Sequence, residues 1–239
     1  MQSFFWLCLT APRVYAALKT EIDAAVSDGT IPASGNVEWT QAQNLPYFQA
    51  CLKEAMRIRP AVGLNITRYA PGPDGVEIDG RHYPAGTRLA VNGWVLHRDT
   101  AVFGSDADFF RPERWLEDEE NAKVMERYMC QVRRSLLRTL PCHVFVLPCC
   151  FLSQLCFLTV KSIHCPLTRE HRHQQFGGGA HVCIGRNLAL LEINKVCPRL
   201  LRDFDFQLVN PTRELKAKAT FFVVQEGLEV YIARRTPGL

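Results

Sequence analysis

One cysteine stands at the end of a glycine-rich loop, in the segment Phe-Gly-Gly-Gly-Ala-His-Val-Cys-Ile-Gly that ends at Gly185. The glycines let the backbone turn tightly and approach a flat partner, because no Cβ stands in the way. The apolar repeat that starts near Ile184 predicts a helix directly after Cys183. The free N–H groups and positive dipole end of such a helix favour the thiolate over the thiol. A thiolate held in this way is a ligand type of haem iron.

Other glycine-rich sites fit this loop poorly. A phosphate loop requires Gly-Lys followed by Ser or Thr, which the segment lacks. The dinucleotide pattern Gly-x-Gly-x-x-Gly fails at Val182. A buried structural cysteine beside a glycine turn remains the alternative to a ligand.

Two further motifs combine acids and arginines. Glu54 and Arg57 are three residues apart on an expected helix, so they share one face and can pair. On its own this spacing also fits a solvated ion pair. Downstream, residues 111–115 have the sequence Arg-Pro-Glu-Arg-Trp.

Hydrophobic periodicity predicts the helices that position these motifs. We expect helices over residues 12–26 and 45–58, and a third that starts near Ile184. Pro198 should kink this third helix or shorten its last turn.

Short apolar runs separated by turn residues predict the strands. Residues 62–95 should form a small antiparallel sheet of hairpins. Residues 97–114 are expected to be an ordered loop with short helical turns. The tail from 204 to 232 alternates again around Gly227, which suggests a terminal hairpin.

Together these motifs resemble the cytochrome P450 family. The cysteine segment matches its signature Phe-x-x-Gly-x-[Arg/His]-x-Cys-x-Gly at every fixed position, with His181 where Arg is commoner. The Glu-x-x-Arg and Pro-Glu-Arg-Trp motifs follow in the family's order, and residues 94–115 resemble fungal P450s of the pisatin-demethylase type. The resemblance implies a mainly α fold with small antiparallel β-hairpins, corresponding to the proximal, haem-thiolate half of a truncated P450 fold.

The resemblance also implies a binding site for haem b, iron protoporphyrin IX. Cys183 would be the axial ligand of the iron, and His181 and Arg68 would contact the propionates. The residues expected to bind the cofactor are Cys183, Phe176, Gly179, His181, Gly185 and Arg68.

Other positions take family roles by the same resemblance. Glu54, Arg57 and Arg114 would form a buried ion network that locks the loop beneath the haem. Residues 61–65 and 220–222 correspond to loops that line the substrate pocket.

The activity implied is that of a monooxygenase, which inserts one oxygen of O₂ into a small organic substrate. Electrons would come from NADPH-cytochrome P450 reductase, docked on a weakly basic face near Arg111, Arg114 and Arg186. Full-length relatives are expected in the endoplasmic reticulum membrane. No signal peptide is recognised and the N-terminal anchor is absent, so we expect a cytoplasmic chain, although membrane association is possible.

The charge of the chain excludes a general affinity for nucleic acid. The net charge is +4, but residues 132–175 contain six Lys or Arg against one acid, so the remainder is slightly negative. No basic stripe with interleaved aromatic residues is present. The ten cysteines are expected to be reduced, because a chain of this size does not need disulfides.

Residues 132–175 interrupt the resemblance and divide the chain into segments 1–131, 132–175 and 176–239. We expect this insertion to be unstructured. Gln131-Val132 is readable as CAG-GTN, the usual flank of a splice donor, so a retained intron is our hypothesis. A membrane helix over 140–160 and a zinc site in its Cys and His residues are the alternatives.

The sequence lacks the family's distal motif of an acid followed by threonines, [Ala/Gly]-Gly-x-[Asp/Glu]-Thr-Thr. We therefore identify no catalytic residue and expect little activity. The alternative function is a non-catalytic haem-binding remnant, or a faulty gene model with a retained intron.

Overall fold

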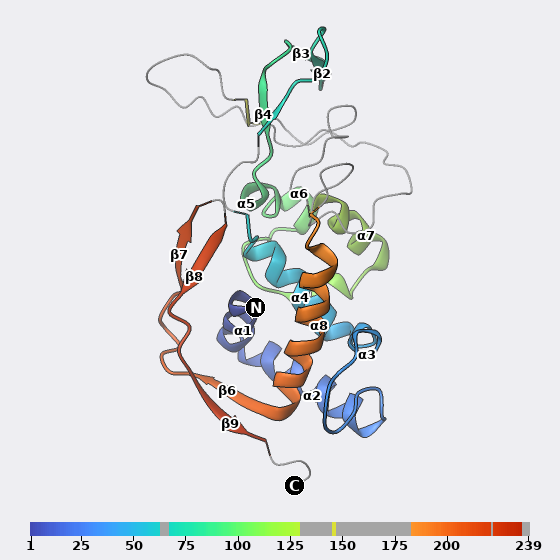
Figure 1. Ribbon diagram of the computed structural model, residues 1–239, viewed down its shortest axis with the longest axis vertical. Helices are drawn as coiled ribbons and strands as arrows, with labels where there is room; N and C mark the ends of the chain where they lie inside the picture. The colour runs from blue at the N-terminus through green and yellow to red at the C-terminus, as the bar shows by residue number, and fades with distance from the viewer. Residues whose placement is uncertain (63–66, 130–144, 147–182, 221, 236–239) are drawn as a thin grey trace.

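A computed structural model of the chain describes residues 1–62, 67–129, 145–146, 183–220 and 222–235 (Figure 1). It is mainly helical with short antiparallel sheets, as expected. The helices are α1 (Gln2–Thr10), α2 (Pro12–Ser27), α3 (Trp39–Gln43), α4 (Pro46–Ile58), α5 (Gly93–Leu96), α6 (Thr100–Phe103), α7 (Glu119–Tyr128) and α8 (Arg186–Asp203), with a 3₁₀ turn η1 (Pro112–Trp115). The strands are β1 (Arg68–Tyr69), β2 (Val76–Ile78), β3 (Arg81–Tyr83), β4 (Arg88–Ala90), β5 (Phe145–Val146), β6 (Phe204–Leu208), β7 (Lys216–Ala219), β8 (Val223–Glu226) and β9 (Val230–Arg234).

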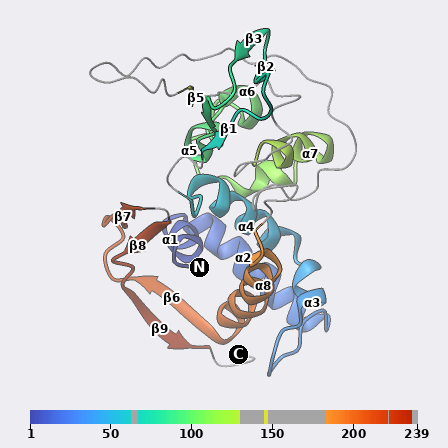
Figure 2. The same ribbon diagram turned by 45° about the horizontal axis from the view of Figure 1, so that its top comes forward.

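The main apolar core lies where α1, α2, α4 and α8 meet, as both views of the ribbon show (Figures 1 and 2). Val14, Leu18 and Ile22 of α2 are fully buried because their spacing of four residues places them on one helix face. A second cluster joins α4 to the segment around η1 and α7. Met56 of α4 packs against both clusters, so α4 connects the two halves of the interior.

A carboxylate from α2 caps the start of α4. Pro46 occupies the first turn, where its missing N–H costs no hydrogen bond. The next two backbone N–H groups, of Tyr47 and Phe48, donate to Glu21 at 2.6 and 2.7 Å. Burial raises the pKa of Glu21, although these two hydrogen bonds oppose the shift. The helix that carries Glu54 and Arg57 is therefore anchored at its first turn.

The expected hairpins are present in residues 67–95. β2 and β3 pair across Asp79 and Gly80, both with positive φ, which is the geometry of a tight two-residue hairpin turn. β1 pairs with β4, and β4 also pairs with β5. β5 is the part of the predicted insertion 132–175 that the structure describes. The segments suggested as a membrane helix and as a zinc site otherwise lie outside the described residues.

The C-terminal ribbon differs in detail from the prediction. A terminal hairpin forms, but Gly227 is not its turn: β8 pairs with β7, and β9 pairs with β6. Gly227, with φ +93°, instead separates β8 from β9. There Glu229 accepts a hydrogen bond from Arg213 at 2.7 Å, and the two sheets follow one another in a single long ribbon (Figure 1).

Pro198 does not shorten α8, which continues to Asp203. Within the ranges that the structure describes, no helix is both long enough and apolar enough to cross a membrane.

Candidate functional site

Glu54 is a fully buried carboxylate surrounded by donors. Its Oε1 accepts from Arg57 Nη2 at 2.8 Å, from Arg114 Nε at 3.0 Å and from the backbone N–H of Arg111 at 3.0 Å. Its Oε2 accepts from Arg57 Nε at 2.8 Å and from Trp115 Nε1 at 2.9 Å. The structure therefore brings Glu54, Arg57 and Arg114 together. The contacts from Trp115 and from the backbone of Arg111 were not predicted.

Arg57 extends this network to the backbone of a distant segment. While its Nε and Nη2 face Glu54, its Nη1 donates to the carbonyls of His97 at 2.7 Å and Ala107 at 2.5 Å, and its Nη2 also donates to Phe109 at 3.1 Å. The guanidinium is fully buried, so these carbonyls replace its hydration. Arg57 thus fixes where residues 97–109 cross α4.

Arg114 holds the same segment from the other side. It donates to the carbonyls of Phe103 and Asp106 and to the Asp106 carboxylate, the last at 3.0 Å. Asp106 also accepts from Arg111 Nε at 2.5 Å. Burial opposes ionisation of Asp106, but the two arginines lower its pKa overall. Asp106 completes the network, and no sequence motif had singled it out.

His97 is a buried member of the network that sequence reasoning also missed. Burial, helped by the nearby charges of Arg57 and Arg98, lowers its pKa to about 4, against the opposing effect of a hydrogen bond to the carbonyl of Arg57. The ring is therefore neutral, with Nδ1–H donating to that carbonyl at 3.2 Å. Since Arg57 donates back to the carbonyl of His97, the two residues join α4 and α5 reciprocally.

A second carboxylate, Glu113 of the Arg-Pro-Glu-Arg-Trp motif, binds α2 and α4. It accepts from Arg13 Nη1 at 2.6 Å and from the Tyr47 hydroxyl at 2.7 Å. Partial burial would raise the pKa of Glu113, but these two donors lower it to about 2. Burial and the contact with Glu113 raise the pKa of Tyr47, so its hydroxyl stays protonated and able to donate.

Cys183 precedes α8, which begins three residues later. Its carbonyl accepts from the N–H of Arg186 at 3.2 Å, and a Cβ added at Gly185 would lie 3.9 Å from its sulfur. The thiol is exposed, whereas Cys8, Cys51 and Cys197 are buried. Burial raises the pKa of the Cys51 thiol, and that of Cys197 to about 12. Among the cysteines that the structure describes, Cys183 is therefore the one placed to act as a ligand.

The other predicted loop residues, Phe176, Gly179 and His181, lie outside the described residues. Arg68 lies on β1, where Nη1 donates to the carbonyl of Thr67 at 2.9 Å. Its Nε is buried and has no hydrogen-bond partner in the described part of the chain. Haem carries an iron that binds thiolate and two propionate carboxylates. The exposed thiol of Cys183 suits the iron, and the unused donor of Arg68 suits a carboxylate.

The two loops expected to line a substrate pocket meet in the structure. Val62 and Phe222 form an isolated antiparallel bridge, and the N–H of Val223 donates to the carbonyl of Ala61 at 2.8 Å. Phe222 is 57% exposed, so an aromatic side chain lies at the surface of this junction. Residues 63–66 lie outside the described ranges.

The basic face expected near Arg111, Arg114 and Arg186 must be corrected. Arg114 is buried and bonded to Glu54, so it contributes no surface charge. Arg111 is paired with both Asp106 and Glu117. Arg114 therefore serves the interior network, and Arg111 is neutralised by two acids close to it in the chain.

Comparison with known proteins agrees with these motifs. The family model described as Cytochrome P450 matches residues 1–130 and 157–231. The chain belongs to the cytochrome P450 family. The stretch that the P450 model leaves unmatched, 131–156, covers the first part of the predicted insertion 132–175, whereas residues 157–175 are matched.

Curated fungal P450 proteins are similar over nearly the whole chain. Cytochrome P450 monooxygenase cicH of Emericella nidulans is 34% identical over 98% of this chain. Pisatin demethylase of Fusarium vanettenii is 30% identical over 95%, and cytochrome P450 monooxygenase gsfF of Penicillium aethiopicum is 32% identical over 98%. The predicted pisatin-demethylase-like, fungal character is confirmed. The chain spans 38%, 34% and 37% of the lengths of these three relatives. Two of these relatives are named as P450 monooxygenases and one as a demethylase.

Replacing Glu54 tests the network most simply. Glu54→Gln leaves Arg57 buried without its counter-charge and removes one of the two carboxylates paired with Arg114, so we expect a loss of about 3–5 kcal/mol in the free energy of unfolding, measured by urea denaturation. Trp115→Phe removes one neutral donor and should cost about 1 kcal/mol. As a control, Glu126→Gln breaks the partly exposed pair with Lys53 and should cost at most about 1 kcal/mol. Equal stabilities of Glu54→Gln and Glu126→Gln would contradict the role of the network.

Glu113 predicts a pH dependence of stability. Its pKa in the folded chain, about 2, is below the ordinary value of 4.5. Its ionised form therefore stabilises the fold above about pH 4.5, and this contribution is lost as the pH falls toward about 2. The difference in unfolding free energy between the wild type and Glu113→Gln should shrink over that window in urea titrations. When the same comparison is made in the Tyr47→Phe background, the effect of Glu113→Gln on the unfolding free energy should be smaller. An effect that does not change with pH would refute the lowered pKa of Glu113.

Proposed function

We propose that this chain supplies the cysteine side of a haem-thiolate monooxygenase site, with Cys183 as the axial ligand of the iron of haem b. The observation that carries the proposal is the exposed thiol of Cys183 at the start of α8, within a segment that matches the P450 signature. Gly185 leaves the space beside the sulfur free of a side chain.

We further propose that Arg68 and His181 bind the haem propionates, with Phe176 and Gly179 shaping the loop. The buried, unpartnered Nε of Arg68 supports its part in this assignment, because a carboxylate would provide the missing acceptor. When bound, haem with a thiolate ligand supplies the chemistry of O₂ activation.

The role proposed for Glu54, Arg57 and Arg114 is structural. Their hydrogen bonds fix the crossing of residues 97–115 over α4. Because α4 shares its core with α8, this crossing is set relative to the helix that follows Cys183.

The proposed substrate is a small organic molecule, oxidised with electrons from NADPH-cytochrome P450 reductase. The junction of Val62 with the exposed Phe222 supports an apolar contact with the substrate. One of the similar proteins is named for the demethylation of pisatin. An endoplasmic reticulum location is proposed for the full-length protein by family resemblance alone.

We propose that the chain by itself has little monooxygenase activity. The acid-threonine motif of the family is absent from its sequence, so no residue is assigned to deliver protons to oxygen. We therefore expect this chain to bind haem without oxidising a substrate.

Replacement of Cys183 tests the ligand assignment. We expect the haem-loaded chain, reduced and exposed to CO, to show the red-shifted Soret band of thiolate ligation, and Cys183→Ser to lose it. Cys197→Ser, which changes a buried thiol within α8, should retain the band. A band that survives Cys183→Ser, or one absent from the wild type, would refute the proposal.

We also propose that residues 132–175 are translated from a retained intron between the family segments 1–131 and 176–239. The unmatched stretch 131–156 supports an insertion at this place. Transcript sequencing should find messages that lack these codons and keep the reading frame. Transcripts that all contain the stretch would contradict this origin.

A further inference from the structure

A buried asparagine joins α8 to two other helices. Asn194 is 1% exposed, and its Oδ1 accepts from Gln49 Nε2 of α4 at 2.6 Å and from Gln43 Nε2 of α3 at 3.0 Å. Its Nδ2 donates to the carbonyl of Leu190 in its own helix at 2.8 Å. Gln49 Nε2 also donates to the carbonyl of Ala42 at 2.9 Å. The three amide side chains thus form a connected network where α3, α4 and α8 converge.

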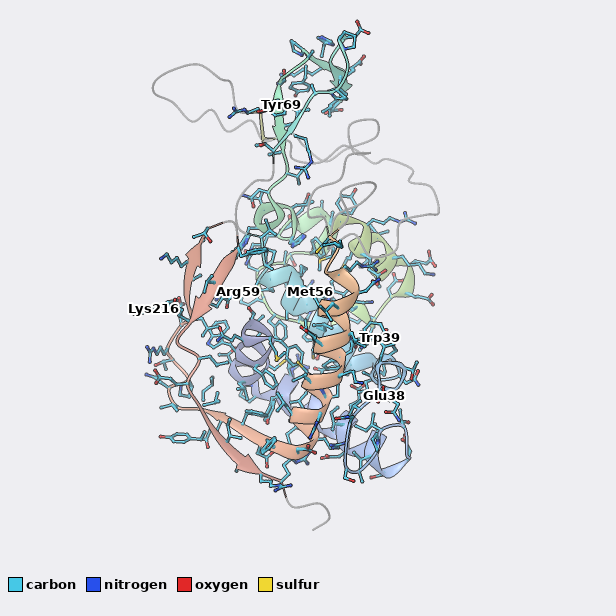
Figure 3. All side chains as sticks on the ribbon, viewed as in Figure 1. Glu38, Trp39, Met56, Arg59, Tyr69 and Lys216 are labelled. Carbon is cyan, nitrogen blue, oxygen red and sulfur yellow. The ribbon has the colours of Figure 1, made fainter. Side chains whose placement is uncertain are left out.

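Two side chains of α8 make buried, directional hydrogen bonds to other segments: Arg202 donates to the carbonyls of Pro32 and Gly35, and Asn194 bonds to α3 and α4. The apolar and partly exposed contacts of α8 differ in kind. Cys197 and Leu201 pack into the apolar core, and such packing has little directional preference. Lys195 pairs with Glu38, labelled at the start of α3 in Figure 3, but this pair is partly exposed and screened by salt. A satisfied buried amide network instead favours one alignment of the helices, since any slip leaves a polar group unpaired.

The place of Asn194 along α8 strengthens its effect. Pro198 has no N–H to donate to the carbonyl of Asn194, so the side-chain anchor coincides with a gap in the hydrogen bonds of the helix. Toward the N-terminus α8 continues to Arg186, close to Cys183, and on α4 Gln49 precedes Glu54 by little more than one turn. Fixing Asn194 against Gln49 therefore fixes the start of α8 relative to the buried network of Glu54.

We propose that Asn194 is a positioning residue for Cys183. Through Gln49 and Gln43 it sets the register of α8 on α4, and thereby the place at which the thiolate meets the haem iron. The inference rests on the proposed haem-thiolate function and assigns a role within it to a residue outside the signature segment.

The test compares four variants of the full chain. Asn194→Leu keeps the approximate size of the side chain and removes its hydrogen bonds, and Gln49→Leu breaks the same link from α4. The double variant places two apolar side chains together, and Asn187→Leu makes the same substitution at an exposed position of α8. For each variant, haem is added, and the fraction of haem with the thiolate-type CO band is measured at equal haem content. Amide hydrogen exchange of α8 is followed by mass spectrometry on the haem-free chain.

Asn194→Leu and Gln49→Leu should each reduce the thiolate-type fraction and speed exchange in residues 186–194 about tenfold. In the double variant, the loss of the thiolate-type fraction should be smaller than the sum of the losses in the two single variants, because Asn194 and Gln49 interact directly. Asn187→Leu should match the wild type in both measurements, although it lies nearer to Cys183.

Two results would overturn the inference. In the first, exchange quickens in Asn194→Leu while the thiolate-type fraction stays at the wild-type value, so Asn194 stabilises α8 without positioning the sulfur. In the second, α8 exchange does not change in Asn194→Leu. If the wild type shows no thiolate-type band, the proposed function has failed. The exchange measurement then decides separately whether Asn194 anchors α8.

Discussion

Glu54 carries its carboxylate where water does not reach, and donors from the surrounding chain replace the solvent. A buried charge is tolerated only when it is paired and fully hydrogen-bonded, so every partner of Glu54 is constrained in position. Two of these partners, Arg57 and Arg114, then bind backbone carbonyls of residues 97–109. One carboxylate on α4 thus dictates the path of a segment that has little regular structure of its own. Two partly buried carboxylates, Glu113 and Glu21, likewise accept hydrogen bonds from α4, and each has fewer partners than Glu54.

The sequence motifs predicted the three central residues of this network but not the residues around them. Glu54 and Arg57 could be found because their spacing places them on one helix face, and the family resemblance added Arg114. Asp106 and His97 could not be found, because they contribute through contacts between segments far apart in the chain. α7 was missed although Asp118 at its cap and Glu119 and Glu120 in its first turn are helix-start signals. The pairing of β6 with β9 could not be predicted, because an alternation of apolar and polar residues indicates a strand but not the strand with which it pairs.

The helix after Cys183 connects the local and long-range parts of the structure. Its start follows from a motif readable in the sequence, but its attachment to α3 and α4 depends on Asn194, Gln49 and Gln43, which form no recognisable pattern. The family match includes the segment that precedes the helix. The buried contacts explain why the start of α8 lies at one place relative to α4. The chain spans little more than a third of the lengths of these two relatives.

The most direct test of cysteine ligation is resonance Raman spectroscopy of the ferric, haem-loaded chain, prepared with ordinary cysteine and with cysteine labelled by a heavy sulfur isotope. If the folded chain presents Cys183 to iron, a low-frequency iron–sulfur stretching band should be present, move down with the heavy isotope and vanish in Cys183→Ser. A spectrum without an isotope-sensitive band, from a chain that binds haem, would show that iron takes another ligand and would contradict the assignment.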